Sequence, residues 1–288
     1  MPAQMPANMA LATLPVGGLV AGKNALVAWH PRVSFARPLL VVLFLHGKEP
    51  DPQNFAWTGH KLPQQMAIPE KNAVLIAPTM RMVQGSVDPT YLSTTDGIST
   101  VVQEGLAAIG DAAGKPADGA FDRASLHLVG YSNGYIAWGR AVTTLQATPA
   151  AAPVMGHSLF DCLFWDTPLM RGAKGIDPAN ARFSDGAKRI VESSFVTTHF
   201  TKNGGGTLPQ SQSLDSMVRH DAALRLHADI PDSLTAGDVV ILHRKSVEDH
   251  FEAVSCEEGL AELVSAVPGF DLPPIAIAGE VPAPPSPG

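Results

Sequence analysis

The chemistry that the sequence indicates most directly is that of a serine nucleophile, Ser132. It lies in the segment 130–134, Gly-Tyr-Ser-Asn-Gly, which follows an apolar run at 124–129 and precedes a stretch with helical spacing. Strand, sharp turn and helix in this order are typical of a nucleophile elbow, where the serine has a strained backbone and its hydroxyl is exposed above the sheet. Gly130 and Gly134 fit this pattern because larger side chains would collide with the flanking strand and helix. Such a motif also arises by chance, so the interpretation depends on the residues around it.

A serine hydroxyl needs a general base within hydrogen-bond reach, and the usual base is a histidine. Catalytic groups collect at the carboxyl ends of parallel strands. His250 follows the apolar segment 238–243, which is the last expected strand, whereas His243 lies within that strand. His127 lies inside the strand before the elbow and is expected in the core. We therefore predict that His250 is the base, in preference to His243.

The base in turn needs a carboxylate, which fixes the imidazole tautomer and stabilises the imidazolium. After such an elbow the usual chain order is serine, acid, histidine. Asp161 lies at the end of the expected strand 154–162, and Asp166 follows a short distance later. No Asp or Glu lies directly after the next expected strand, 194–199. This favours Asp161 as the acid and leaves Asp166 as the alternative.

Backbone N–H groups must stabilise the negative charge that develops on the substrate oxygen. One donor is expected from Asn133, the residue after the serine. The second is expected from Gly47 or Lys48, because His46 and Gly47 end the uninterrupted apolar run 39–45.

Aromatic side chains near the serine and the acid could line an apolar acyl pocket, although core packing explains them equally well. The pocket candidates are Tyr131, Trp138 and Phe164. The stretch from Met80 to Asp96 has no clear period and reads as a loop that could cover the site as a lid.

Apolar runs alternate with helical patterns along the chain, which predicts βαβ units and a mostly parallel sheet. The runs 39–45 and 73–78 are apolar without alternation, as central strands covered on both faces require. We expect the α/β class, a three-layer α/β/α sandwich around roughly eight strands. One domain should span 24–267, with an N-terminal extension at 1–23 and a disordered Pro- and Ala-rich tail at 268–288. Helical patterns fall at 61–69, 98–113, 133–145, 185–193, 210–226 and 251–267.

Composition excludes several classes of protein. The net charge of -7, with no basic run, argues against a nucleic-acid partner. No window is long and apolar enough for a membrane span. No Cys/His spacing resembles a zinc site, and we expect neither metal nor cofactor.

Cys162 and Cys256 are expected to be separate, reduced thiols. No Lys or Arg precedes Lys23, which is unlike a secretory signal; the default expectation is cytoplasmic, or secreted or periplasmic if the N-terminus was trimmed.

Taken together, the elbow, the His46-Gly47 turn, the later acid and the late histidine resemble the α/β-hydrolase superfamily over residues 24–267. Finer detail is similar to a group of bacterial α/β hydrolases. In that group the aspartate of a Leu-x-Asp-x-Leu-aromatic segment is a plausible triad acid, which supports Asp161. Asn133 departs from the commoner elbow of the group, which has glycine there. The matching segments are 63–65 (Pro-Gln-Gln), 72–78, 159–164 (Leu-Phe-Asp-Cys-Leu-Phe) and 194–199.

The resemblance implies a serine hydrolase that cleaves a carboxylic ester, less readily an amide, through an acyl-enzyme on Ser132. The implied partner is a small-molecule ester, and no cofactor is needed. The superfamily also has members without catalysis, and the same triad can transfer an acyl group to an alcohol or thiol. A non-catalytic binding protein and an acyltransferase therefore stay open as alternatives.

Overall fold

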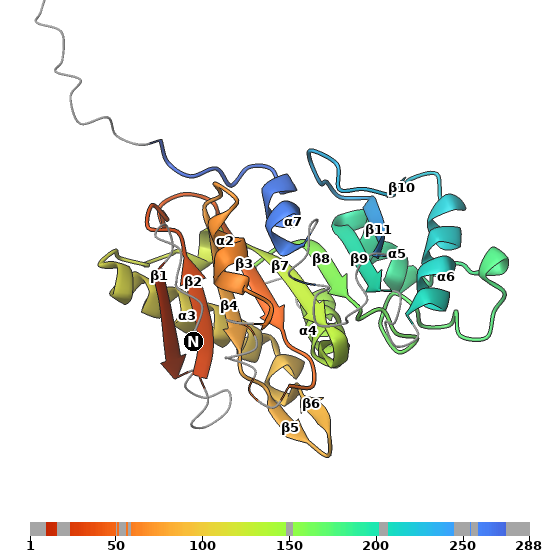
Figure 1. Ribbon diagram of the computed structural model, residues 1–288, viewed down its shortest axis with the longest axis horizontal. Helices are drawn as coiled ribbons and strands as arrows, with labels where there is room; N and C mark the ends of the chain where they lie inside the picture. Colours follow the sequence, from red (N-terminus) through yellow and green to blue (C-terminus); the bar gives the residue numbers. More distant parts are fainter. Residues whose placement is uncertain are drawn as a thin grey trace, which may run out of the picture.

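A mixed β-sheet forms the centre of the protein. The computed structural model describes residues 10–15, 24–49, 51, 56, 59–147, 152–201, 207–244, 254 and 259–274 (Figure 1). Within these residues the main sheet has nine strands, and all are parallel except at β1–β2 and β2–β4, which pair antiparallel. In sheet order they are β1 (Ala10–Pro15), β2 (Asn24–Trp29), β4 (Ala73–Pro78), β3 (Leu39–Leu45), β7 (Ala124–Tyr131), β8 (Val154–Phe160), β9 (Phe195–Thr201), β11 (Asp238–Arg244) and β10 (Arg225–His227).

Helices cover both faces of this sheet, which confirms the expected three-layer α/β/α sandwich. Alternate residues of each strand face opposite sides, so a strand such as β3 buries side chains in both layers. One layer contains α2 (Leu62–Ala67) and α7 (Leu260–Ala266), which contact each other (Figure 1). The other contains α3 (Thr95–Ala113), α4 (Tyr135–Ala147), α5 (Asp185–Ser193) and α6 (Leu208–Arg219).

β1 lies within 1–23, the expected N-terminal extension, and pairs with β2 in the sheet. Two further elements differ from the sequence-based expectation because each is too short to show a period. The stretch expected as a loop contains a hairpin, β5 (Arg81–Val83) with β6 (Ser86–Asp88). Gln84 and Gly85 form its two-residue turn with φ of 49° and 77°, the left-handed conformation that such turns require. The last strand in sheet order, β10, has three residues and lies partly in a segment expected to be helical.

The buried amide of Gln65 joins distant parts of the chain in the α2–α7 layer. Its Nε2 donates to the carbonyl oxygens of His60, at 2.9 Å, and Val254, at 2.6 Å. Its Oε1 accepts from the backbone N–H of Ala261 at 3.2 Å. All three hydrogen bonds are buried, so they fix the start of α7 against α2.

Residues 268–274, at the start of the segment expected to be a tail, pack along the beginning of β4. The backbone N–H of Asn72 donates to the Phe270 carbonyl, and that of Leu272 donates to the Glu70 carbonyl at 3.3 Å. Phe270 is buried in the α2–α7 layer.

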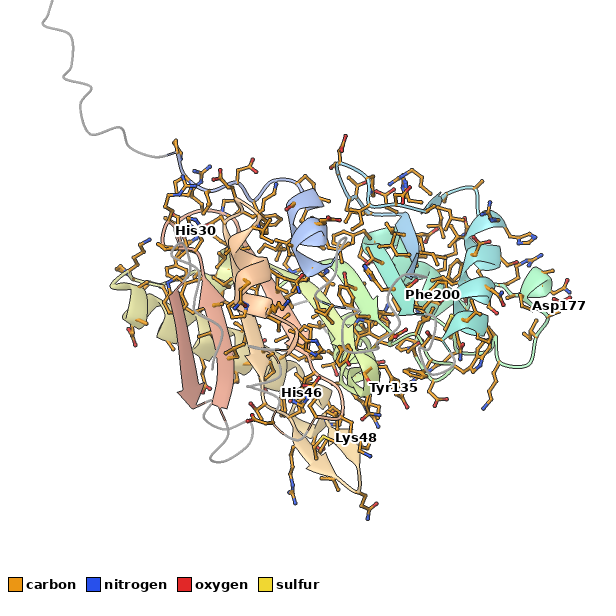
Figure 2. The ribbon with its side chains drawn as sticks, viewed as in Figure 1. His30, His46, Lys48, Tyr135, Asp177 and Phe200 are labelled. Carbon is orange, nitrogen blue, oxygen red and sulfur yellow. The ribbon has the colours of Figure 1, made fainter. Side chains whose placement is uncertain are left out.

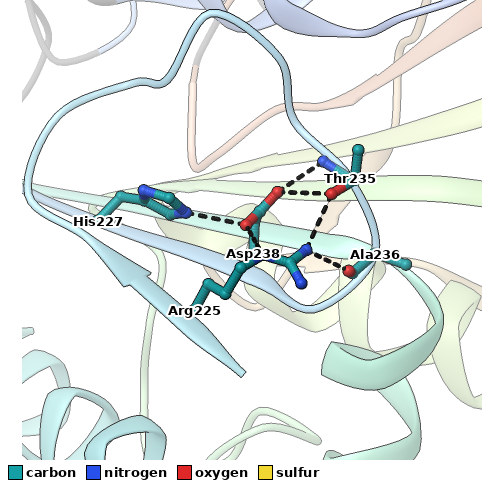
Figure 3. Close-up of polar contacts among 5 residues, drawn as sticks. All are labelled: Arg225, His227, Thr235, Ala236 and Asp238. Carbon is teal, nitrogen blue, oxygen red and sulfur yellow. Dashed lines mark hydrogen bonds and ion pairs between the residues drawn. The ribbon is translucent and has the colours of Figure 1, made fainter. Parts of the chain in front are cut away.

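A polar cluster holds the edge strand β10 to β11 (Figure 3). The carboxylate of Asp238 accepts hydrogen bonds from Arg225 Nε at 2.7 Å, from His227 Nε2 at 2.8 Å, and from the backbone and hydroxyl of Thr235. Burial opposes ionisation of Asp238, but these donors outweigh it and hold the pKa of the carboxyl well below its usual range. Because Asp238 begins β11, the cluster lies at the end of the sheet opposite to the elbow.

Neutral histidines are buried inside the sheet, as expected for His127. Thr197 donates its hydroxyl to Ser158 Oγ at 2.8 Å, and His127 Nε2 lies 2.7 Å from the same oxygen. His157 packs edge-on against Trp138. Burial lowers the pKa of His127 and of His157 from 6.5 to about 3.

We expect this burial to make the protein sensitive to acid. Below about pH 6.5 the unfolded chain binds protons on His127 and His157 that the folded chain excludes, so the free energy of unfolding falls with pH. The loss is up to about 1.4 kcal/mol per pH unit for each imidazole, until the pH approaches their folded-state pKa. Urea unfolding at a series of pH values measures it.

His157→Leu removes one of the two groups and should flatten this pH dependence by up to about 1.4 kcal/mol per pH unit. An unchanged dependence in the variant would show that His157 is not the source of the effect.

Candidate active site

Ser132 has the strained conformation expected of a nucleophile elbow. It directly follows β7, has φ of 51°, and begins a 3-10 turn that leads into α4. Positive φ is uncommon for a residue with a side chain. The glycines beside it are required by close packing: a Cβ on Gly134 would lie 2.2 Å from the Leu45 carbonyl oxygen, and one on Gly130 would lie 2.9 Å from Cys162 Sγ. Cys162 is a free, buried thiol.

The loop after β3 lies against the serine side chain. A Cβ on Gly47 would be 2.8 Å from Ser132 Cβ and 3.2 Å from Ser132 Oγ. The structure thus brings together the serine and the backbone of Gly47, as expected from the chain order. Figure 2 shows the neighbouring His46 and Lys48 near the hairpin β5–β6, at the end of the sheet where Tyr135 begins α4.

His46 fixes the conformation of this loop, a role that the sequence pattern did not reveal. Its Nε2 accepts a hydrogen bond from the backbone N–H of Met80 at 2.8 Å. Its Nδ1 therefore carries the proton and donates to the Gly47 carbonyl oxygen at 2.7 Å. Burial lowers the pKa of His46, which favours the neutral imidazole that these two hydrogen bonds require. Because a peptide is planar, fixing the Gly47 carbonyl also fixes the Lys48 N–H.

Asp161 has the same position at the end of β8 that Ser132 has at the end of β7. Tyr131 and Phe160 are paired in the β7–β8 register, so the next residues, Ser132 and Asp161, end adjacent parallel strands. Asp161 also has positive φ, 45°, and its side chain is buried. Its backbone N–H donates to the His199 carbonyl at 2.8 Å.

Thr207 contacts this carboxylate. Its hydroxyl donates to Asp161 Oδ1 at 3.3 Å from the residue that precedes α6. Sequence reasoning missed Thr207, because a lone threonine before a helix reads as a cap. Asp166, the alternative acid, is exposed.

The three aromatic pocket candidates have different environments. Tyr131 is buried and contacts His60 edge-on, with ring centroids 4.3 Å apart. Trp138 is fully buried in the layer of α3 and α4. Phe164 is only partly buried and packs on the ring of Tyr135 at 4.7 Å. Of these three, Phe164 therefore has surface free to contact a ligand.

The expected base, His250, lies outside the described residues, as does the side chain of His243. The described residues on either side of 245–253 are Arg244, which ends β11, and Val254, whose carbonyl accepts from Gln65.

A buried pair lies in the chain between Gly47 and α2. His60 Nε2 and Glu49 Oε1 are 3.0 Å apart, and both side chains are almost fully enclosed. The pair contacts the residue before Ser132, because the His60 ring packs against Tyr131.

The described part of the chain contains no group of three or more His, Cys, Asp or Glu side chains placed to hold a metal ion. None of its helices combines the length and apolar character that a bilayer span needs.

No protein-family model matches this sequence. No curated protein matches it either. Solved structures with a similar fold include the feruloyl esterase module from Clostridium thermocellum, as an S954A mutant complexed with sinapinate. Its sequence is 10% identical, its TM-score is 0.51, and the match covers 92% of this chain and 91% of that chain. An esterase from the bacterial hormone-sensitive lipase family is 11% identical with a TM-score of 0.50, and the match covers 91% of this chain and 83% of that chain. Esterase B from Lactobacillus rhamnosis is also 11% identical with a TM-score of 0.50, covering 91% and 84%.

The contact between Gly134 and β3 leads to a prediction about stability. Gly134→Ala places a methyl group into the Leu45 backbone carbonyl, which cannot move without disturbing the centre of the sheet. We expect the free energy of unfolding to fall by about 2–4 kcal/mol, measured by urea denaturation.

Gly186→Ala is the matched control, because a Cβ on this glycine of α5 meets nothing within 4 Å. It should be neutral or stabilise by up to about 1 kcal/mol through helix propensity. Equal effects of the two substitutions would contradict the packing explanation.

Proposed function

Because the chain has the α/β-hydrolase fold, we propose that it is a serine hydrolase that cleaves carboxylic esters of small molecules. The observation that carries the proposal is the left-handed backbone of Ser132 at the end of β7, with Gly47 packed against its side chain. A buried core residue would gain nothing from this strain, whereas a nucleophile gains an accessible hydroxyl. The esterases among the similar structures support an ester as the substrate.

In the proposed reaction, Ser132 Oγ attacks the carbonyl carbon of the ester while its proton passes to His250. The carbonyl oxygen becomes an oxyanion that accepts hydrogen bonds from the backbone N–H of Asn133 and that of Gly47 or Lys48. The tetrahedral intermediate then collapses, and His250 protonates the departing alcohol. Water, deprotonated by His250, attacks the acyl-enzyme, and the carboxylic acid is released as His250 returns that proton to Ser132 Oγ.

Asp161 is the proposed acid that orients His250. Its support is its buried position at the end of the strand next to Ser132, together with the hydroxyl of Thr207, which donates to one of its oxygens. The exposed Asp166 lacks such an environment. For His250, the support is that β11 ends at the same edge of the parallel sheet as β7 and β8.

Ser132→Ala should reduce p-nitrophenyl ester hydrolysis by at least about 1,000-fold, because the nucleophile is lost while the fold keeps its packing. A fluorophosphonate probe, which labels activated serines, should label the wild type and not the variant. Both are measured on purified protein, by absorbance and by intact mass.

Ser216→Ala is a matched control, since Ser216 Oγ also lies near a histidine, 3.5 Å from His220 Nδ1, but on the exposed surface of α6. Activity and labelling should be unchanged in this variant. Labelling that survives Ser132→Ala would exclude Ser132 as the nucleophile.

Asp161→Asn should lower kcat by about 100- to 10,000-fold, because an amide cannot stabilise the imidazolium of the base. Asparagine tolerates positive φ well, so the backbone conformation should survive. His250→Ala should cause a comparable loss. The measurement is kcat for a p-nitrophenyl ester with circular dichroism of each variant.

Asp166→Asn is the matched control and should stay within about two-fold of wild type, as surface substitutions usually do. If Asp166→Asn were inactive and Asp161→Asn active, the assignment of the acid would be reversed.

A further inference from the structure

We infer that the side chain of Asn133 is a positioning residue that holds the oxyanion-binding backbone in place by anchoring the hairpin β5–β6 to the elbow. The inference deepens the proposed function and rests on it. It concerns the side chain of Asn133, whereas the proposed mechanism uses only its backbone N–H.

The contact is specific to the return strand of the hairpin. Asn133 Oδ1 accepts a hydrogen bond from the backbone N–H of Val87 at 2.9 Å and from the hydroxyl of Ser86 at 3.2 Å. Val87 pairs with Met82 in the hairpin register, one position beyond the pair Val83–Ser86 that closes the two-residue turn.

In an antiparallel ladder, residues at this position direct their N–H groups away from the partner strand. The N–H of Val87 is therefore not used within the hairpin, and Val87 is buried. The amide of Asn133 supplies its acceptor. A glycine at residue 133 would leave this N–H without one.

The same hairpin is tied to the other side of the proposed oxyanion site. Met80, directly before β5, donates its N–H to His46, and His46 in turn donates to the Gly47 carbonyl. At the hairpin turn, Lys48 Nζ is 3.3 Å from the position of a Cβ on Gly85. Figure 2 shows His46 and Lys48 close to the hairpin.

One hairpin thus contacts both segments that carry the proposed oxyanion donors, the elbow at Asn133 and the loop at Gly47 and Lys48. These segments are separated by more than eighty residues in the chain. An oxyanion site works only if its donors are held in position before the charge develops. The hairpin and the Asn133 amide provide that constraint, which should act on the rate of acyl transfer more than on substrate binding.

The test is a double-mutant cycle on purified full-length protein with p-nitrophenyl acetate. Asn133→Ala should lower kcat by about 10- to 100-fold and change KM by less than about three-fold. Ser86→Ala removes one of the two donors and should lower kcat by about three- to ten-fold, whereas Ser86→Thr keeps a hydroxyl and should restore it. Because both act through one contact, Ser86→Ala should cost little more in the Asn133→Ala background.

Asn180→Ala, an exposed asparagine in the distant 3-10 turn 178–180, is the matched control and should leave kcat unchanged. The rate of phosphonylation of Ser132 by a fluorophosphonate should fall in parallel with kcat while KM and the circular dichroism spectrum stay close to wild type, a combination that loss of the fold would not give. Independent, multiplicative losses from the two substitutions, or wild-type kcat in Asn133→Ala, would overturn the inference.

Ser132→Ala, measured alongside, separates the two proposals. If it is inactive while Asn133→Ala has wild-type kcat, only the role of the Asn133 side chain is refuted. If Ser132→Ala keeps wild-type activity, the proposed function fails and this inference fails with it. Should Asn133→Ala not fold, the comparison of Ser86→Ala with Ser86→Thr decides.

Discussion

The close approach of the elbow to β3 is the constraint on which the site depends. The backbone of Gly134 lies against the carbonyl of Leu45, and Gly47 lies against the side chain of Ser132, so no side chain fits at either glycine. This packing holds Ser132 in a left-handed conformation that costs about 1–3 kcal/mol by itself. The energy comes from the buried centre of the sheet, where β3 and β7 pair over seven residues. The proposed nucleophile is thus held by the buried centre of the sheet.

The same parallel geometry explains how separate segments meet. Strands β3, β7 and β8 are neighbours, so the loops after them converge at one edge of the sheet. Two of the residues that follow these strands, Ser132 and Asp161, share the uncommon positive φ. His46 reinforces the arrangement because, as a buried neutral imidazole, it bonds the Gly47 carbonyl without adding a charge beside the proposed oxyanion.

Sequence patterns predicted the long apolar elements and the elbow between its two glycines. The elbow, the buried strand β3 and the three-layer arrangement could be predicted because periodicity and motif spacing encode them. The hairpin β5–β6 could not, since three-residue strands show no period and only its Gln84-Gly85 turn carries a signal. The contacts of Asn133 and Thr207 were also hidden, because side-chain hydrogen bonds between distant segments leave no local pattern. The proposed roles of Asp161 and His250 stay predictions.

Gln65 has a consequence for the order in which the chain can fold as it is synthesised. Its amide is buried near the start of the chain, but two of its three partners, Val254 and Ala261, emerge from the ribosome almost two hundred residues later. Until α7 arrives, this layer of the sheet has an exposed apolar face and an unsatisfied amide group. The other layer, built from α3 to α6, can pack during translation. Completion of this layer therefore waits until α7 has emerged, and a chain stalled before that point is exposed to aggregation and to chaperones.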